Sequence, residues 1–421
     1  MRTIKDTLTL DDARRISGPL SFNLMLKPAG SLCNLNCSYC YYLDKSEIYG
    51  GHEPRMTVEE LERFVRAYIS ACETDEVTFN WHGGEPLILG LEFYRKAVEF
   101  QKRYAGDKTI HNTLQTNATL VTAEWADFFA SERFLLGVSV DGPEQVHDRY
   151  RRDRGGAPTL SRTVEGIRKL HSAGAEYNLM ATVNSASEGK GLQVYEFLKG
   201  LGSRYMQFSP VLEHVVYPVR NGKPDRHARP HIVDPSEDGA VLAPWSVSPT
   251  GFGRFLCDIF DYWVRHDVGR FFVNYFDCTL ANWCGVMPGT CSFAETCGGN
   301  AVVEHNGDVY CCDHFVYPKY RLGNIYSDSL GDMMQSPEQL RFGIDKRNSL
   351  PGKCLRCEAW PLCHGGCPKH RFNVTDSGQT GLNALCEGYG MFFRHTSSAM
   401  RKMKDLLLEG KAPALIMMQA F

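Results

Sequence analysis

The residues best suited to do chemistry are three closely spaced cysteines, Cys33, Cys37 and Cys40, in the stretch CNLNCSYC. Iron–sulfur clusters are usually held by four Cys thiolates. Three thiols without a fourth in the same loop therefore indicate a cluster with one iron left open to a small molecule, as in catalytic metal sites. The alternative interpretation is a zinc or structural site that borrows a distant fourth cysteine.

A second set of cysteines follows in the C-terminal half. Its eight members are Cys291, Cys297, Cys312, Cys354, Cys357, Cys363, Cys367 and Cys386. Eight thiols suffice for two sites with four ligands each, and their spacing suits zinc as well as iron–sulfur clusters. The five remaining cysteines are expected to be small buried hydrophobic residues. They are Cys72, Cys257, Cys278, Cys284 and Cys311.

Composition indicates the cellular compartment and argues against two classes of partner. The chain has 421 residues, 16 of them cysteine, and a formal net charge of -3. That charge gives no reason to expect nucleic acid or an anionic membrane surface. Residues 1–15 are charged throughout and do not resemble a secretory signal, and no apolar run is long enough to cross a membrane. Many cysteines in such a chain indicate metal binding in a reducing compartment, so we expect a cytoplasmic protein.

The elements that must position these cysteines alternate between strand and helix patterns. Six strand-like runs, at 22–26, 77–81, 110–115, 135–140, 177–183 and 205–208, are separated by helical patterns. This alternation predicts an α/β fold, a partial (β/α)6 parallel barrel. The cysteine loop follows the first strand, and sites in parallel barrels lie at the C-terminal ends of the strands.

The clearest helix is predicted over 57–70, where Thr57 and Glu60 form a capping box. Further helices are expected over 252–267 and 394–408. Residues 212–249 contain six prolines and many charges, which predicts a long irregular insertion. We divide the chain into an N-terminal extension (1–20), the barrel (21–249), a helical linker (250–285), a cysteine-rich domain (286–395) and a C-terminal helix (396–421).

Two motifs at predicted strand ends connect the loop to a known family. WHGGEP ends the second strand, and its glycines permit close backbone approach to a ligand. Together, CxxxCxxC and GGEP resemble the radical S-adenosylmethionine (SAM) enzymes, whose open iron chelates the amino and carboxylate groups of SAM. The resemblance implies that Tyr39 and Leu212 lie by the adenine, that the Gly84 backbone pairs with the amino group, and that Ser139 and Arg151 contact the ribose and carboxylate.

The C-terminal half resembles the SPASM domain, an auxiliary module of radical SAM enzymes that modify peptides. The resemblance implies one 4Fe-4S cluster on Cys291, Cys297, Cys312 and Cys367. It implies a second on Cys354, Cys357, Cys363 and Cys386. The expected cofactors are therefore SAM and three 4Fe-4S clusters, one that binds SAM and two that are auxiliary.

Across nearly the whole chain, the sequence is similar to anaerobic sulfatase-maturating enzymes. The shared stretches include CNLNCSYCYYL, WHGGEP, LQTNATL, GVSVDGP, NGDVYCCDHF and LGNI. This resemblance implies oxidation of a Cys or Ser in a sulfatase polypeptide to Cα-formylglycine. A 5′-deoxyadenosyl radical takes hydrogen from the β-carbon, Asp313 accepts the proton, and an auxiliary cluster accepts an electron. A low-potential electron donor such as flavodoxin or ferredoxin is the expected second partner.

Two other functions are weighed against this one. Another SPASM-type enzyme would form thioether or carbon–carbon crosslinks, and the sequence around Asp313 favours the sulfatase reaction over it. A non-catalytic zinc or electron-transfer protein would leave the GGEP motif and the three-cysteine loop unexplained.

Overall fold

The computed structural model describes residues 7–17, 22–50, 55–220, 223–226 and 228–418. Its central feature is a sheet with strand order β12-β6-β5-β4-β3-β2-β1-β13-β14-β15. The first six strands are parallel neighbours. They are β1 (Asn23–Lys27), β2 (Glu76–Trp81), β3 (Thr109–Thr116), β4 (Leu135–Ser139), β5 (Glu176–Val183) and β6 (Tyr205–Pro210). The six predicted barrel strands are thereby confirmed.

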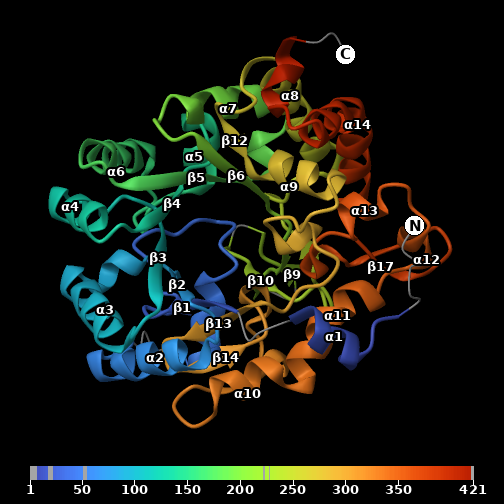
Figure 1. Ribbon diagram of the computed structural model, residues 1–421. Helices are drawn as coiled ribbons and strands as arrows, with labels where there is room; N and C mark the ends of the chain where they lie inside the picture. Colours follow the sequence, from blue (N-terminus) through green and yellow to red (C-terminus); the bar gives the residue numbers. More distant parts are fainter. Residues whose placement is uncertain (1–6, 18–21, 51–54, 221–222, 227, 419–421) are drawn as a thin grey trace.

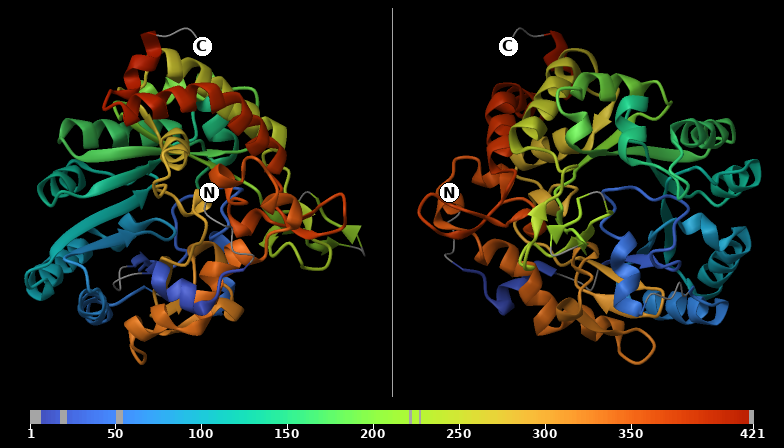
Figure 2. Two further views of the ribbon diagram at one scale, coloured as in Figure 1. Left: turned by 45° about the vertical axis from the view of Figure 1, so that its right-hand side comes forward. Right: turned by 180° about the vertical axis from the view of Figure 1, so that it is seen from behind.

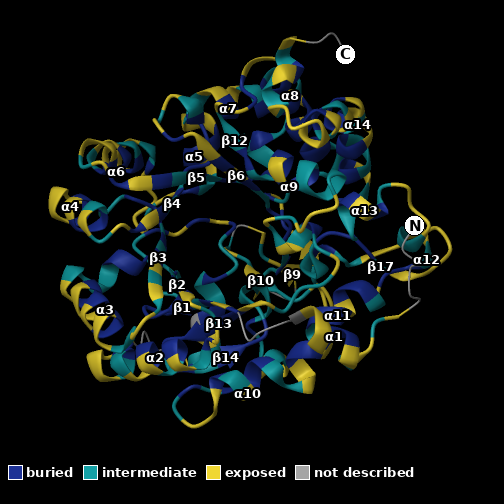
Figure 3. Cartoon of the chain, in the orientation of Figure 1, coloured by how far each residue is buried: buried dark blue, intermediate teal, exposed yellow. Residues whose placement is uncertain are grey.

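Helices cover the outer face of this curved sheet (Figure 1). They are α2 (Val58–Ala71), α3 (Leu91–Tyr104), α4 (Ala123–Ser131), α5 (Glu144–Tyr150), α6 (Leu160–Ser172) and α7 (Gly191–Lys199). The predicted capping box is present at the start of α2, where Thr57 accepts from the Glu60 backbone and the Glu60 side chain accepts from the Thr57 backbone. Exposed residues lie on the outward faces of α3, α4 and α6, and the inner faces are buried against the sheet (Figure 3).

The cysteine-rich half continues the barrel sheet. Strand β13 (Asn300–Glu304) pairs in parallel with β1, from Asn23↔Asn300 to Lys27↔Glu304. Strands β14 (Asp308–Tyr310) and β15 (Arg321–Asn324) follow in antiparallel order, and β12 (Phe272–Val273) extends the other edge beside β6. The edge of β1 is therefore covered rather than left as an open template for pairing.

Two long helices join the halves on one side of the molecule (Figure 2). Helix α8 (Pro249–His266) crosses α14 (Cys386–Leu408) so closely that a Cβ on Gly253 would lie 2.8 Å from the Gly388 backbone. The first helix begins three residues before the predicted start, because Ser248 caps it. The second begins eight residues early, because Tyr389, Phe392 and Phe393 bury an apolar face there.

The long irregular insertion predicted at 212–249 contains regular structure, which corrects that prediction. This segment contains a small sheet of β7 (His214–Val216), β10 (His231–Val233) and β11 (Val241–Leu242), and a ribbon of β8 (Val219–Arg220) and β9 (Lys223–Pro224). Strands of two or three residues are too short to show periodicity. Val215 and Trp245 of this segment pack in one buried cluster with Leu35 and Cys37, so the segment covers the cysteine loop.

The remaining elements are short. They include α1 (Leu10–Ser17), α9 (Asn274–Trp283), α10 (Leu330–Gln335), α11 (Pro337–Asn348), α12 (Gly352–Leu355), α13 (Trp360–Cys363), β16 (Asn373–Val374) and β17 (Thr380–Leu382). Of the predicted N-terminal extension, residues 1–6 and 18–20 lie outside the described residues. The described part forms α1, whose Ala13 packs against Leu340 and Ile344 of α11. None of the described helices has the length and apolar character needed to cross a membrane.

Candidate active site

The cysteine loop emerges from the C-terminal end of β1 and is partly or fully buried. The thiols of Cys33, Cys37 and Cys40 interact electrostatically with one another. Burial raises the pKa of Cys37 to about 12, against the nearby Arg151 guanidinium, and Cys40 raises it further. The Leu35 backbone N–H donates to Cys33 Sγ at 3.3 Å. Such thiols bind metal by giving up their protons, and a bound metal would then compensate the negative charge of the three buried thiolates.

A buried triad stands beside this loop. The Tyr39 hydroxyl donates to Asp141 Oδ2 at 2.5 Å and accepts from Arg151 Nη1 at 3.0 Å. Arg151 Nη1 also lies 3.7 Å from Asp141 Oδ1, and its side chain is 8% exposed. Arg151 lies within electrostatic reach of Cys37 as well. A fixed positive charge next to the cysteine loop suits a ligand that carries a carboxylate.

The other residues predicted to bind SAM line the same end of the barrel. The Gly84 N–H donates to Gly30 O at 2.9 Å, and a Cβ on Gly84 would lie 2.1 Å from Leu32 O, so only glycine fits there. Ser139 accepts from Gln115 Nε2 at 2.7 Å, and Leu212 is buried in the core. The contacts of these residues with SAM remain predictions.

The eight C-terminal cysteines fall into two electrostatically connected groups. In the first thiol group, burial raises the pKa of Cys312, and neighbouring Cys367 and Cys291 raise it further; Cys297 likewise interacts with Cys291 and Cys367. In the second thiol group, burial raises the pKa of Cys363 to about 12, with added effects from Cys386, Cys354 and Cys357. These are the two sets of four that the sequence predicted.

The chemistry of this donor set fits iron–sulfur clusters. All sixteen cysteines lie within the described ranges and are free thiols. Burial raises the pKa of both Cys312 and its neighbour Cys311. Cys367 and Cys291 raise the pKa of Cys312 further, whereas Glu338 adds to the rise for Cys311. The ligand assignments themselves remain predictions.

Asp313, the predicted proton acceptor, lies directly after Cys312 and contacts two groups from the barrel. Lys27 Nζ at the end of β1 forms an ion pair with Asp313 Oδ1, and the Tyr41 hydroxyl donates to Oδ2. Burial by itself raises the pKa of Asp313. The Lys27 ammonium, together with His82 and His314 when acid protonates them, outweighs burial and holds the pKa below its ordinary value. The side chain is therefore a carboxylate at neutral pH.

Two imidazoles flank this carboxylate in the neutral form. Burial lowers the pKa of both His82 and His314 to about 4. His82 Nδ1 accepts from the Gly83 backbone N–H at 2.9 Å, which places its own proton on Nε2. Sequence reasoning missed Lys27, because a buried lysine at the end of a strand looks like an ordinary boundary residue.

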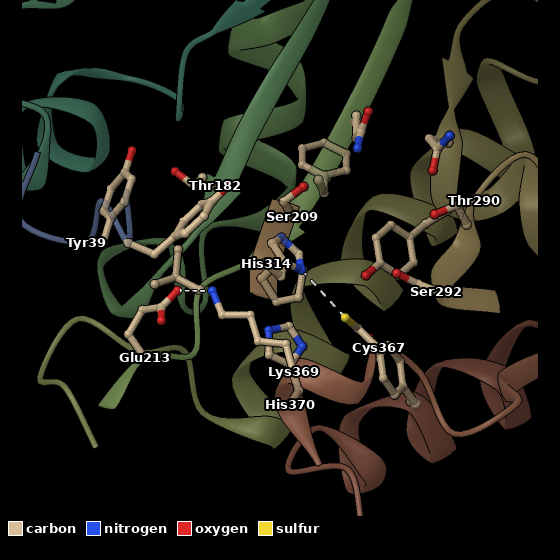
Figure 4. Close-up of a pocket in the computed structure, with 18 of the residues that line it drawn as sticks. Tyr39, Thr182, Ser209, Glu213, Thr290, Ser292, His314, Cys367, Lys369 and His370 are labelled. Atoms are coloured by element: carbon tan, nitrogen blue, oxygen red, sulfur yellow. Dashed lines mark hydrogen bonds and ion pairs between the residues drawn. The ribbon is translucent and has the colours of Figure 1, made fainter. Parts of the chain in front are cut away.

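A cavity of about 220 Å³ lies where the cysteine loop, the barrel and the cysteine-rich half meet. Figure 4 shows Thr182 and Ser209 on the barrel side, and His314 and Cys367 on the opposite side. His314 Nδ1 lies 3.7 Å from Cys367 Sγ. The wall thus includes a cysteine of the first thiol group.

An ion pair also crosses this region. Lys369 Nζ lies 2.5 Å from Glu213 Oε1 (Figure 4). The same ammonium stands over the ring of Tyr41, 4.3 Å from its centroid. Glu213 follows Leu212, so the pair connects the covering segment with the cysteine-rich half. No local pattern marks either residue, because the two partners lie more than 150 positions apart in the chain.

The chain is similar to known proteins over nearly its whole length. The model of the radical SAM superfamily matches residues 28–197, and that of the SPASM iron–sulfur cluster-binding domain matches residues 291–358. The serine-type anaerobic sulfatase-maturating enzyme of Bacteroides thetaiotaomicron is 46% identical over 395 residues, 94% of each chain. That of Klebsiella pneumoniae is 35% identical over 91% of this chain and 89% of its own.

Similarity extends to cysteine-type enzymes and to a solved structure. The cysteine-type anaerobic sulfatase-maturating enzyme of Clostridium perfringens (strain ATCC 13124) is 31% identical over 90% of this chain and 96% of its own. A solved structure of native anSMEcpe with bound AdoMet and Cp18Cys peptide superimposes with a TM-score of 0.79 and 28% identity. It covers 91% of this chain and 99% of that one.

Proposed function

This chain belongs to the anaerobic sulfatase-maturating enzymes, and from that premise we propose that it oxidises a serine of a sulfatase polypeptide to Cα-formylglycine. It is a radical SAM oxidoreductase with an auxiliary iron–sulfur domain. The choice of serine over cysteine follows the serine-type relatives, which are 46% and 35% identical, against 31% for the cysteine-type relative.

The main support for this proposal is the position of Asp313, directly after a cysteine of the first thiol group. The reaction removes one hydrogen atom from the β-carbon, one proton from the hydroxyl or thiol, and one electron. Asp313 supplies a carboxylate for the proton, and it is bonded in sequence to Cys312 of the first thiol group. Loss of the proton and the electron at adjacent positions avoids a build-up of charge in a buried site.

The chain's own residues prepare this step. When bound, the cluster of the cysteine loop and SAM supply the radical that abstracts the hydrogen atom. Arg151, held by Tyr39 and Asp141, provides the cation for the SAM carboxylate. Lys27 keeps Asp313 ionised, and Tyr41 orients it by donating to its second oxygen.

The sulfatase segment is proposed to enter as an unfolded or peptide strand. The cavity between the cysteine loop and the cysteine-rich half offers space for one side chain, with Tyr41 and His314 in its wall. The similar structure of anSMEcpe was solved with a bound peptide. We further propose a cytoplasmic location and a low-potential electron donor of the flavodoxin or ferredoxin class.

The test is anaerobic incubation of the reconstituted protein with SAM, dithionite and matched sulfatase peptides that contain either serine or cysteine. We expect the serine peptide to lose two hydrogens and to react with a hydrazide, which identifies an aldehyde. A loss of two hydrogens without hydrazide reactivity would indicate a crosslink instead. Faster conversion of the cysteine peptide would refute the serine assignment alone.

The role of Asp313 is tested with Asp313→Asn. We expect SAM cleavage to continue while the yield of aldehyde per SAM falls by about 10²-fold or more, as for the loss of a catalytic acid or base. The matched control is Asp308→Asn in strand β14, shortly before Asp313. Arg321 binds the Asp308 carboxylate outside the cavity. An undiminished yield in Asp313→Asn would reject the assignment of the base.

A further inference from the structure

A short loop links the two thiol groups. Cys363 belongs to the second thiol group and Cys367 to the first, and only three residues separate them. All three have positive φ angles: 45° at His364, 73° at Gly365 and 62° at Gly366. A run of left-handed residues is unusual outside glycine, so something in the surroundings must hold this loop.

Arg371 holds it. Its Nη2 donates to His364 O at 3.0 Å and to Gly366 O at 3.1 Å, and its Nε donates to Gly365 O at 3.0 Å. The guanidinium thus binds each of the three carbonyls between the two cysteines. Its Nη1 donates to the carbonyl of Lys346. The fixed fork of an arginine suits this arrangement, and the single ammonium of a lysine does not.

The charge of Arg371 interacts with cysteines of both thiol groups. It interacts with Cys297 and Cys367 of the first group and with Cys354 and Cys363 of the second. Its hydrogen-bond partners are neutral carbonyls, and among the described residues no carboxylate lies within ion-pair distance of it. The guanidinium charge is therefore available to stabilise negative charge on the thiols of both groups.

Lys346 places a second cation beside the first thiol group. Its side chain is buried, with the residue 1% exposed, and Nζ donates to Cys291 O at 2.8 Å and to Ser292 O at 3.1 Å. It also donates to Ala294 O. The ammonium therefore fixes the loop that carries Cys291, and it interacts electrostatically with Cys297 and Cys367.

We propose that Arg371 is a positioning residue for electron transfer: it fixes the spacing of the two auxiliary clusters and, with Lys346, raises their reduction potentials. This inference rests on the proposed function, in which one electron of the substrate must leave through the cysteine-rich half. Reduction adds negative charge to a cluster that thiolates already make negative. Nearby buried cations favour that reduced form, since net charge and hydrogen bonding set cluster potentials.

The test is a potentiometric titration followed by electron paramagnetic resonance, without SAM or peptide. The full-length chain carries Cys33, Cys37 and Cys40→Ala so that only auxiliary clusters contribute. Arg371→Met and Lys346→Met remove one charge each, and Arg371→Lys keeps the charge without the fork. The control is Arg341→Met, which removes an exposed charge from α11, the helix that carries Lys346.

We expect the equilibrium for reduction to weaken about tenfold or more in both methionine variants, a fall of about 59 mV for a one-electron couple. Lys346→Met should affect the first cluster more strongly than the second. Arg371→Lys should keep the potentials closer to the parent but broaden the signals, and Arg341→Met should match the parent.

Unchanged potentials in methionine variants that retain their iron would overturn the inference. If Arg371→Met loses iron, Arg371→Lys tests the fixing of the loop and Lys346→Met tests the effect of charge; signals and potentials like the parent's in both would overturn the inference. A parent chain without any auxiliary cluster signal would instead overturn the cluster assignments of the proposed function, so the two failures can be distinguished.

Discussion

The buried ion pair between Lys27 and Asp313 makes a quantitative prediction. Lys27 is fully buried, and the side chain of Asp313 is 15% exposed. Lys27→Met preserves most of the volume but leaves Asp313 as an uncompensated buried charge. Breaking such a pair from one side costs about 3–5 kcal/mol. For a domain of the barrel's size this lowers the melting temperature by about 6 °C or more.

The sign of the pH dependence follows from the direction of the shift. The pKa of Asp313 lies below its ordinary value of 3.8. The stability from this pair is therefore present above pH 3.8 and is lost as the pH falls toward the lower folded-state pKa. At neutral pH the full difference between the native protein and Lys27→Met should be visible.

The assay is anaerobic thermal unfolding at pH 7 of four proteins: native, Lys27→Met, Asp313→Asn and the double variant. The double variant should be more stable than Lys27→Met, because it carries no buried charge without a partner. Lys319→Met is the control, since its exposed pair with Asp234 at 3.8 Å should contribute about 0–1 kcal/mol. A melting temperature of Lys27→Met within about 2 °C of native would refute the reasoning.

Three further predictions concern the barrel. Replacing Cys33, Cys37 and Cys40 by Ala should abolish SAM cleavage while iron analysis still finds about eight of about twelve irons; retained cleavage would reject the loop. Arg151→Met should weaken SAM binding about tenfold or more in equilibrium dialysis, since it removes a charged hydrogen-bond donor; unchanged affinity would place SAM elsewhere. Burial raises the pKa of Glu85 to about 7, so the stabilising contribution of this carboxyl is present below pH 4.5 and is lost as the pH rises through 7. The loss amounts to about 3 kcal/mol, so Glu85→Gln should show a smaller fall in melting temperature between pH 5 and pH 8 than the native protein. Parallel curves of melting temperature against pH for the two proteins would contradict this.

Much of the fold could be predicted because local patterns determine it. The six barrel strands alternate with amphipathic helices, and the capping box at Thr57 marked the start of α2. The strands of 212–249 could not be predicted, since their pairing depends on contacts with the cysteine loop, such as Trp245 against Leu35. The pairing of β13 with β1 joins residues nearly 280 positions apart, which no local pattern encodes.

The candidate site likewise contains residues that the sequence predicts and residues that it does not. The cysteine groups and Asp313 belong to motifs with characteristic spacing. Within each predicted set of four, the cysteines influence one another's pKa, and the ligand sets stay predictions. Lys27, Lys369 and Arg371 carry no motif, and their roles arise from partners on distant elements. Arg371 is the clearest case, because an arginine in a loop is usually solvated, and only the left-handed turn before it shows what it binds.

Every step proposed above depends on a cluster, held by Cys33, Cys37 and Cys40, that leaves one iron open to SAM. The most direct measurement is electron–nuclear double resonance of the reduced, reconstituted protein with SAM labelled by ¹⁵N in its amino group and ¹³C in its carboxylate. We expect hyperfine coupling from both labels to this cluster, and we expect it to be lost when the three cysteines are replaced by Ala. A loop closed by a fourth protein ligand, with no coupling from either label, would contradict it.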